Sequence, residues 1–306
     1  MSTKNSAQVA PNVALSVDLS SIPGVVIHQR AQPGEAIAQA LGVPYEAKNE
    51  YVVSPMPEGE SVASSSSDPK LWKPSLEDLK ALPELFVMKE DSDCGTRILF
   101  TLCGCRAMRP MNVRIIERGA DTSTSMTKPC KCGGWICCPL EMTVAKEGEG
   151  RIGTVRENFN PYCSKCCECC FKCSYYHNVY PVADPKAPSA ISMDRSSGGG
   201  LGEPKYELKF NVCCCGENNN CCGATCFNHH AIFNIRDPSS GAVLGNIQKL
   251  FAPSTSGGGD ACCRMLYGYD TFAVGFPEGT SHEERLTILA GILQAEFQLY
   301  EADQDD

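Results

Sequence analysis

Apolar and polar residues alternate in a series of short runs between residues 84 and 277. A period of two, with many β-branched and aromatic residues, indicates strands, and the Gly, Pro, Asn and Asp residues that bound the runs indicate turns. The pattern therefore predicts an antiparallel β structure. Its strands are ELFVMKED (84–91), PMNVRIIERG (110–119), LEMTVAKEG (140–148), GRIGTVREN (150–158), YELKFNV (206–212), HAIFNIRD (230–237) and GAVLGNIQKLF (241–251), followed by two strands within 259–277.

The N-terminal part of the chain has a weaker pattern. IPGVVIHQR (22–30) predicts a short strand or an apolar docking element, GEAIAQALG (34–42) predicts a short helix, and EYVV (50–53) predicts a strand. Residues 1–20 are polar, and we expect them to be disordered.

The length of 306 residues allows one large domain or two small ones, and we expect a single domain over residues 21–302. Two segments rich in Ser, Pro and Gly, near 54–80 and 184–204, predict flexible insertions within that domain. Residues 303–306 form an acidic tail.

A helix is predicted near the C-terminus. Thr280 and Ser281 precede Glu283 and Glu284, which gives an N-cap with acidic residues in the first turn. Apolar residues then cover most of the circumference, at 286, 288, 289, 290, 292, 293, 297, 299 and 300. They leave only a narrow polar strip, formed by Arg285, Gln294, Glu296 and Gln298. Such a helix is typically buried inside protein, so the sequence predicts a closed barrel or a sheet wrapped around it.

Membrane spans and secretion signals are not predicted. The longest uninterrupted apolar run of the C-terminal segment is 288–293, whereas a spanning helix needs about 20 consecutive apolar residues. The N-terminus has no apolar core of a signal peptide. The formal net charge of −9 argues against a nucleic-acid partner. Neither a GxSxG motif nor a P-loop is present, so we do not expect an enzyme.

Cysteine is the unusual component of the sequence, with 21 residues. Without a signal peptide the chain is expected in the cytosol, where disulfides are rare. These cysteines should therefore be thiols, metal ligands or acylated side chains.

Several motifs together resemble the phospholipid scramblase family. They are IPGVVIHQR, FVMKEDSDCGTR (86–97), RPMNVRIIERG (109–119), CKCGGWICC (130–138), IGTV (152–155), GNIQK (245–249) and FAVGFP (272–277). The resemblance covers about residues 20–301. It implies a fold similar to the Tubby C-terminal domain, a closed β-barrel of about twelve strands around a central C-terminal helix. It also implies calcium-stimulated, ATP-independent movement of phospholipids between leaflets at the cytosolic face of the plasma membrane.

The first cysteine cluster occupies the place where scramblases carry S-acylated, that is palmitoylated, cysteines. The resemblance therefore implies lipidation at Cys130, Cys132, Cys137 and Cys138. Each buried methylene of an acyl chain contributes about 0.8 kcal/mol, and stable anchoring takes two chains. The alternative is a set of inert thiols packed in a β turn.

Two denser clusters follow, and the family pattern assigns them no role. Cysteine pairs and a nearby histidine at this spacing suit a tetrahedral zinc site. The zinc candidates are Cys163, Cys166, Cys170, Cys173, Cys213, Cys215, Cys222 and His229. Buried free thiols and further acylation sites remain alternatives.

Calcium would be held, according to the resemblance, just ahead of the C-terminal helix. Asp270 matches one acidic position of the family, but Gly268 stands at the earlier one. The calcium candidates are therefore Asp270 and Glu278. The alternative is an ordinary strand that ends in a turn.

Three functions stay open at this stage. The first is a scramblase that acts on membrane phospholipids. Because a single short helix offers no polar path in a monomer, this function needs a homo-oligomer or an indirect role of the protein. The second is a membrane-tethered lipid-binding or adaptor module without transport activity. The third is a zinc-binding regulatory protein.

Overall fold

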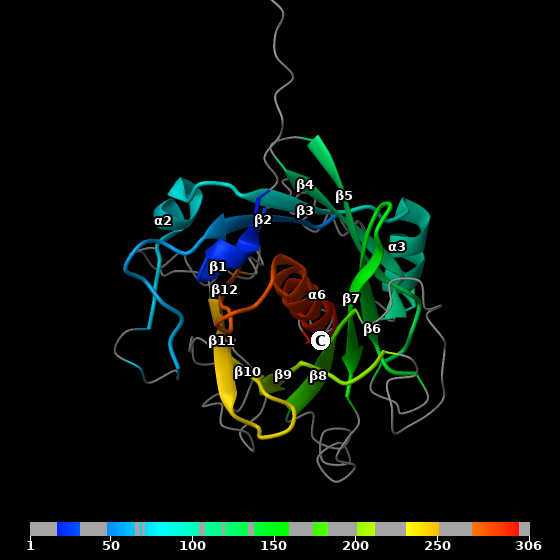
Figure 1. Ribbon diagram of the computed structural model, residues 1–306. Helices are drawn as coiled ribbons and strands as arrows, with labels where there is room; N and C mark the ends of the chain where they lie inside the picture. The colour runs from blue at the N-terminus through cyan, green and yellow to red at the C-terminus, as the bar shows by residue number, and fades with distance from the viewer. Residues whose placement is uncertain are drawn as a thin grey trace, which may run out of the picture.

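The computed structural model describes residues 17–30, 48–64, 68, 71–103, 108–117, 120–133, 138–158, 174–182, 201–211, 231–250 and 271–299. These residues form a closed antiparallel barrel in which every strand pairs with the next one along the chain and β12 pairs with β1 (Figure 1). The strands are β1 (Gly24–Gln29), β2 (Glu50–Pro55), β3 (Phe86–Glu90), β4 (Met111–Glu117), β5 (Ala120–Lys128), β6 (Glu141–Lys146), β7 (Gly150–Glu157), β8 (Ser174–Pro181), β9 (Tyr206–Asn211), β10 (Ala231–Arg236), β11 (Val243–Leu250) and β12 (Thr271–Gly275).

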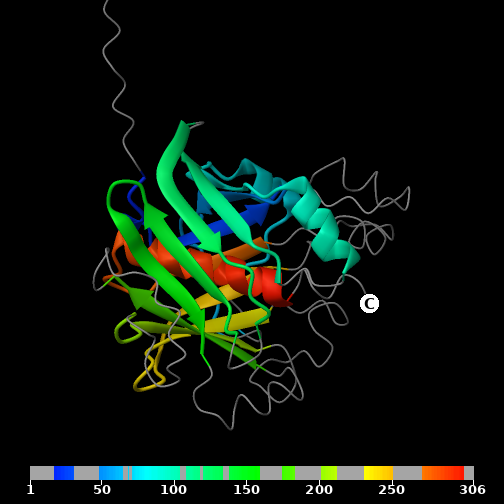
Figure 2. The same ribbon diagram turned by 90° about the vertical axis from the view of Figure 1, so that its right-hand side faces the viewer.

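The predicted fold is confirmed: the molecule is mainly β, with twelve barrel strands and a C-terminal helix inside them. Helix α6 (His282–Leu299) lies lengthwise in the barrel (Figure 2). Its residues from Leu286 to Phe297 are buried. Ser281 caps it reciprocally with Glu284, since the Glu284 N–H donates to Ser281 Oγ and the Ser281 N–H donates to Glu284 Oε2, both at 3.2 Å.

The polar strip of α6 does not face solvent. Arg285, Gln294 and Glu296 are all buried. Arg285 donates to the backbone carbonyls of Leu19 and Ile22, and Glu296 pairs with Lys249 of β11. The strip is therefore an internal polar seam that fastens the helix to its surroundings. Within the described residues, no helix combines the length and apolar character that crossing a membrane requires.

Among the described elements, strands β5 and β8 and helices α2 and α3 were not predicted from the sequence. β5 reads ADTSTSMTK and has few apolar residues, and β8 directly follows a cysteine cluster. Helix α3 (Cys94–Leu102) lies between β3 and β4, and the short helix α2 (Leu76–Ala81) lies between β2 and β3. The predicted helix at 34–42 and the second strand expected in 259–277 fall outside the described residues.

Parts of two segments expected to be flexible are packed against the barrel. Leu19, in the predicted disordered N-terminus, is fully buried in the short 3-10 helix η1 (Leu19–Ser21), because Arg285 binds its carbonyl. In the insertion near 54–80, Trp72 and Leu79 pack on the outer face of β1, β11 and β12. Gln248 of β11 donates to the Trp72 carbonyl at 2.7 Å. Of the insertion near 184–204, the structure describes only 201–204.

Two glycines let α6 approach the barrel wall closely. A Cβ on Gly153 of β7 would stand 1.9 Å from Thr287 Oγ1, and a Cβ on Gly291 of α6 would stand 2.4 Å from Leu208 Cδ1 of β9. Both distances are far below normal contact. The helix accordingly packs closest to β6, β7 and β8.

We predict that Gly153→Ala destabilises the protein. The added methyl group collides with Thr287 in a packed interior, and such overpacking costs about 1–3 kcal/mol of unfolding free energy. Urea denaturation followed by circular dichroism measures the change. The same substitution made in a Thr287→Ala background should cost less, because the Oγ1 and Cγ2 atoms are gone. An equal cost in both backgrounds would show that this contact does not limit packing.

Candidate functional site

The order of the strands gives the barrel two distinct ends. Because neighbouring strands are antiparallel, the connections from β1 to β2, β3 to β4, β5 to β6, β7 to β8, β9 to β10 and β11 to β12 are all attached at one end. The C-terminal turn of α6 lies at this end too, since Gln298 contacts Glu157, the last residue of β7. All 21 cysteines of the sequence belong to five of these connections. We call this end the cysteine end.

Cys130 and Cys132 are exposed at the cysteine end, as is Cys103 after α3, while Cys138 is half-buried. Of the four predicted lipidation residues, Cys137 lies outside the described residues. Gly133 makes the turn between Cys132 and Cys138 possible. It has a φ of +64°, and a Cβ there would meet Leu140 Cγ at 2.6 Å. Its N–H donates to the Cys138 carbonyl at 3.0 Å.

Helix α3 adds an apolar surface to the same end. Leu99 is 58% exposed and Leu102 is 68% exposed. The helix starts after Asp93, whose carboxylate accepts a hydrogen bond from the Thr96 N–H at 2.9 Å. The Arg97 side chain is held in place by hydrogen bonds that it donates to Ser92. Its sequence, CGTRILFTL, contains no carboxylate. In the sequence, this helix could have been recognised from Asp93, an N-cap residue that precedes a run of apolar residues.

Buried charges lie beneath the cysteine end. Lys249 Nζ is 3.2 Å from Glu296 Oε2, and both side chains are 3% exposed. Arg109 and Glu90 form a second buried pair at 2.8 Å, and Lys128 Nζ donates to the Arg109 carbonyl at 2.7 Å. Charges removed from water are tolerated only when paired and hydrogen-bonded. These pairs therefore fix the strand ends from which the cysteine-bearing connections start.

A hydrogen-bond chain links α6 to the first cysteine cluster. Gln298 Nε2 donates to Glu157 Oε1 at 3.0 Å, and Gln298 Oε1 lies 2.9 Å from His177 Nε2. The second oxygen of Glu157 accepts the Leu140 N–H at 3.0 Å. Leu140 in turn lies against Gly133. The C-terminal turn of α6 thus positions the turn that carries Cys132 and Cys138. His177 was missed because it sits in β8, an unpredicted strand.

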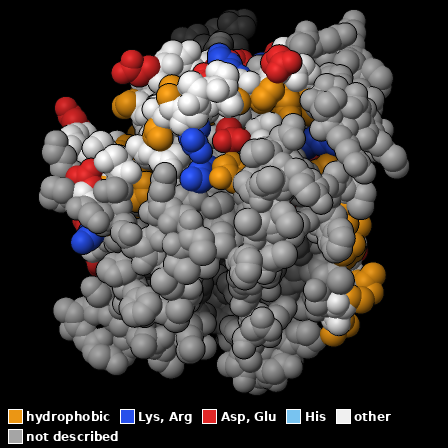
Figure 3. Space-filling model, turned by 90° about the horizontal axis from the view of Figure 1, so that it is seen from below, with side chains coloured by type: hydrophobic (Ala, Val, Ile, Leu, Met, Phe, Trp, Pro, Cys, Tyr) orange, Lys and Arg blue, Asp and Glu red, His pale blue; other side chains and the backbone are white. Residues whose placement is uncertain are grey.

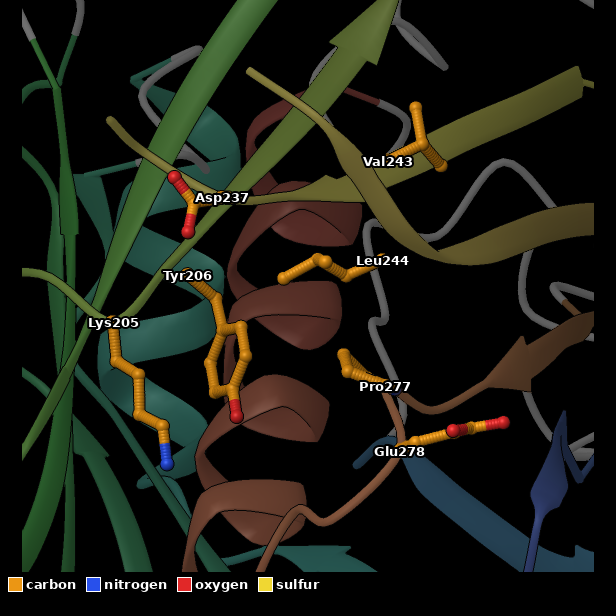
Figure 4. Close-up of a pocket in the computed structure, with 7 residues that line it drawn as sticks. All are labelled: Lys205, Tyr206, Asp237, Val243, Leu244, Pro277 and Glu278. Atoms are coloured by element: carbon orange, nitrogen blue, oxygen red, sulfur yellow. The ribbon is translucent and has the colours of Figure 1, made fainter. Parts of the chain in front are cut away.

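The opposite end of the barrel carries an open pocket of about 490 Å³ (Figure 4). Its lining residues are Lys205, Tyr206, Asp237, Val243, Leu244, Pro277 and Glu278. Burial and the neighbouring Glu284 carboxylate raise the pKa of Tyr206. Hydrogen bonds from Ser239 and Ser240 lower the pKa of Asp237 to about 2, so this carboxylate is ionised at neutral pH.

Neither predicted metal site is assembled by the described residues. Asp270 lies outside them, and Glu278 lines the pocket at the end of the barrel opposite Thr271, the first residue of β12. The five residues of β12 extend about 13 Å, far beyond what one calcium ion bridges. The eight zinc candidates are also outside the described residues. Within the described part, no three His, Cys, Asp or Glu side chains form a metal-binding group.

Charges of both signs are mixed on the described surface. In the view from below, basic, acidic and hydrophobic side chains alternate, and the described atoms form no continuous basic patch there (Figure 3).

Comparisons with known proteins identify no relative: no family model, no curated protein and no solved structure matches the chain. The fold and the site therefore define only the structural class of the protein. It is a closed twelve-stranded barrel with an enclosed helix and with its cysteines in the connections at one end.

The buried pair between Lys249 and Glu296 gives a test of how the cysteine end is held. We predict that Lys249→Met lowers the unfolding free energy by about 3–5 kcal/mol, because it leaves a buried carboxylate without its countercharge. The double variant Lys249→Met with Glu296→Leu should recover most of the loss. Chemical denaturation of the wild type and these variants measures both effects, and a double variant as unstable as the single one would contradict this account.

Proposed function

We propose that this protein is a membrane-associated protein of the scramblase type, attached at the cytosolic face of the plasma membrane by acyl chains on its cysteine end. The observation that carries the proposal is the gathering of all 21 cysteines on connections at one end of the barrel. A protein anchored by several thioester-linked chains must direct those thiols toward one surface. Among the described cysteines, Cys103, Cys130 and Cys132 are exposed at this end, in line with that requirement.

The described cysteines and α3 support attachment in physical terms. Cys130 and Cys132 are exposed, as an acylation site must be. Two acyl chains give stable anchoring where one gives only marginal, reversible binding. Leu99 and Leu102, exposed at the same end, would add apolar contact with the lipid interface.

The proposal that the protein moves lipids between leaflets is based on the sequence resemblance to the phospholipid scramblase family. The twelve-stranded barrel around α6 is the fold that the resemblance implies, which supports the link. A headgroup must cross about 30 Å of hydrocarbon along a polar path. Since α6 is enclosed by the barrel, we propose that such a path forms between copies in a homo-oligomer. Calcium stimulation rests on the resemblance alone, because Glu278 and the start of β12 lie at opposite ends of the barrel.

The second candidate is a tethered lipid-binding or adaptor module without transport. The enclosure of α6 favours it, since the helix is committed to the protein interior. The zinc-binding alternative depends on cysteines outside the described residues and stays a sequence-based hypothesis.

Attachment is tested in cells that express the full chain. A variant with Cys130, Cys132, Cys137 and Cys138 replaced by Ala should lose hydroxylamine-sensitive acyl exchange and move from the membrane pellet to the supernatant. Replacement of Cys262 and Cys263 by Ala, in another connection at the same end, is the matched control and should leave attachment in place. A four-Ala variant that stays on the membrane with its acyl signal intact would refute the anchor.

Transport is tested separately with purified, membrane-bound protein in liposomes that contain a fluorescent phospholipid. If the protein moves lipids, dithionite added outside should quench the inner-leaflet signal in the presence of calcium and without ATP. Empty liposomes and the four-Ala variant are the controls. Protein that stays bound but leaves the inner-leaflet signal untouched would exclude transport and support the adaptor function.

A further inference from the structure

Cys132 and Cys138 form a structured pair within the first cysteine cluster. The Cys132 N–H donates to the Cys138 sulfur at 3.2 Å. The Gly133 N–H is bonded to the Cys138 carbonyl at 3.0 Å, which closes the turn between the two residues. These two hydrogen bonds keep Cys132 and Cys138 close to each other, which the formation of a disulfide requires.

The surroundings of Cys138 favour its thiolate. Partial burial opposes ionisation, but hydrogen bonds from the Cys132 side chain and from the N–H groups of Cys132 and Gly133, with the Lys131 ammonium nearby, lower the pKa of Cys138. The thiolate is the nucleophilic form of cysteine. Cys138 is half-buried and Cys132 is exposed, so a small disulfide has access to the pair.

We infer that Cys138 and Cys132 are a reversible thiol–disulfide couple that reacts with glutathione disulfide, Cys138 as the attacking thiolate and Cys132 as the resolving thiol. Cys138 attacks one sulfur of glutathione disulfide, forms a mixed disulfide and releases one glutathione thiolate. Cys132 then loses its proton, attacks the Cys138 sulfur and releases the second glutathione. Two protein thiols are oxidised, and one glutathione disulfide is reduced to two glutathione thiols, which take up the two protons.

The couple has a consequence for anchoring, and that part rests on the proposed function. A sulfur in a disulfide cannot carry an acyl chain. Oxidation therefore withdraws two of the four candidate acylation sites, and acylation of either residue prevents formation of the disulfide between them. Oxidation would leave Cys130 and Cys137 as the acylation sites of this cluster, and the number of acyl chains that the cluster can carry would fall from four to two.

The test uses the unacylated full-length protein in glutathione buffers of rising disulfide content, followed by alkylation of the remaining thiols. Trypsin and chymotrypsin cut after Lys131 and Trp135, so that Cys132 falls on one peptide and Cys137 and Cys138 on another. Mass spectrometry should find these two peptides joined in the oxidised samples and separate after reduction.

The variant Cys138→Ser should abolish the joined peptides, and Cys137→Ser, one residue away, is the matched control that should retain them. Joined peptides that persist in Cys138→Ser and vanish in Cys137→Ser would overturn the assignment. So would two peptides that stay separate in buffers that already oxidise other cysteines of the chain. Since neither membrane nor acyl group takes part, failure of the couple is distinct from failure of the anchor.

Discussion

Burial of a helix inside a closed barrel is the constraint from which the rest of this structure follows. A barrel has no free edge, so its backbone hydrogen bonds are satisfied, and its interior must be filled. α6 fills it, but the helix carries Arg285, Gln294 and Glu296 into that interior. The backbone carbonyls of Leu19 and Ile22 accept from Arg285, and Lys249 pairs with Glu296. Within the described residues neither polar atom of Gln294 has a partner, a cost that the surrounding packing must offset.

The same helix connects the interior to the surface chemistry. Its last turn reaches Glu157 through Gln298, Glu157 holds the Leu140 backbone, and Leu140 lies against Gly133 in the turn of Cys132 and Cys138. The geometry of two thiols is therefore set by a helix that none of the cysteines belongs to. Positioning residues of this kind keep a reactive turn in one conformation, which a loop of small residues alone would not do.

Much of this fold was predictable from the sequence. Strands with clear alternation, such as β4 and β6, and the capped start of α6 were predictable from local patterns. β5 was not predictable, because its Ser and Thr residues do not alternate with apolar residues. Of its residues, Met126 belongs to the hydrophobic core. The polar seam of α6 was visible as a strip, but its burial depends on partners such as Lys249, which lie far away along the chain. Likewise, no local pattern shows that Cys103 and Cys130 share one end, since that follows only from the order of the strands.

The contacts that Arg285 makes with the carbonyls of Leu19 and Ile22 also hold the first described residues beside the start of α6. The Val17 N–H donates to Glu117, and the Leu19 N–H donates to His282 at the start of α6, so the segment before Val17 is attached opposite the cysteine end. The residues after Leu299 continue from the cysteine end itself. The first and last described residues, Val17 and Leu299, therefore lie at opposite ends of the barrel.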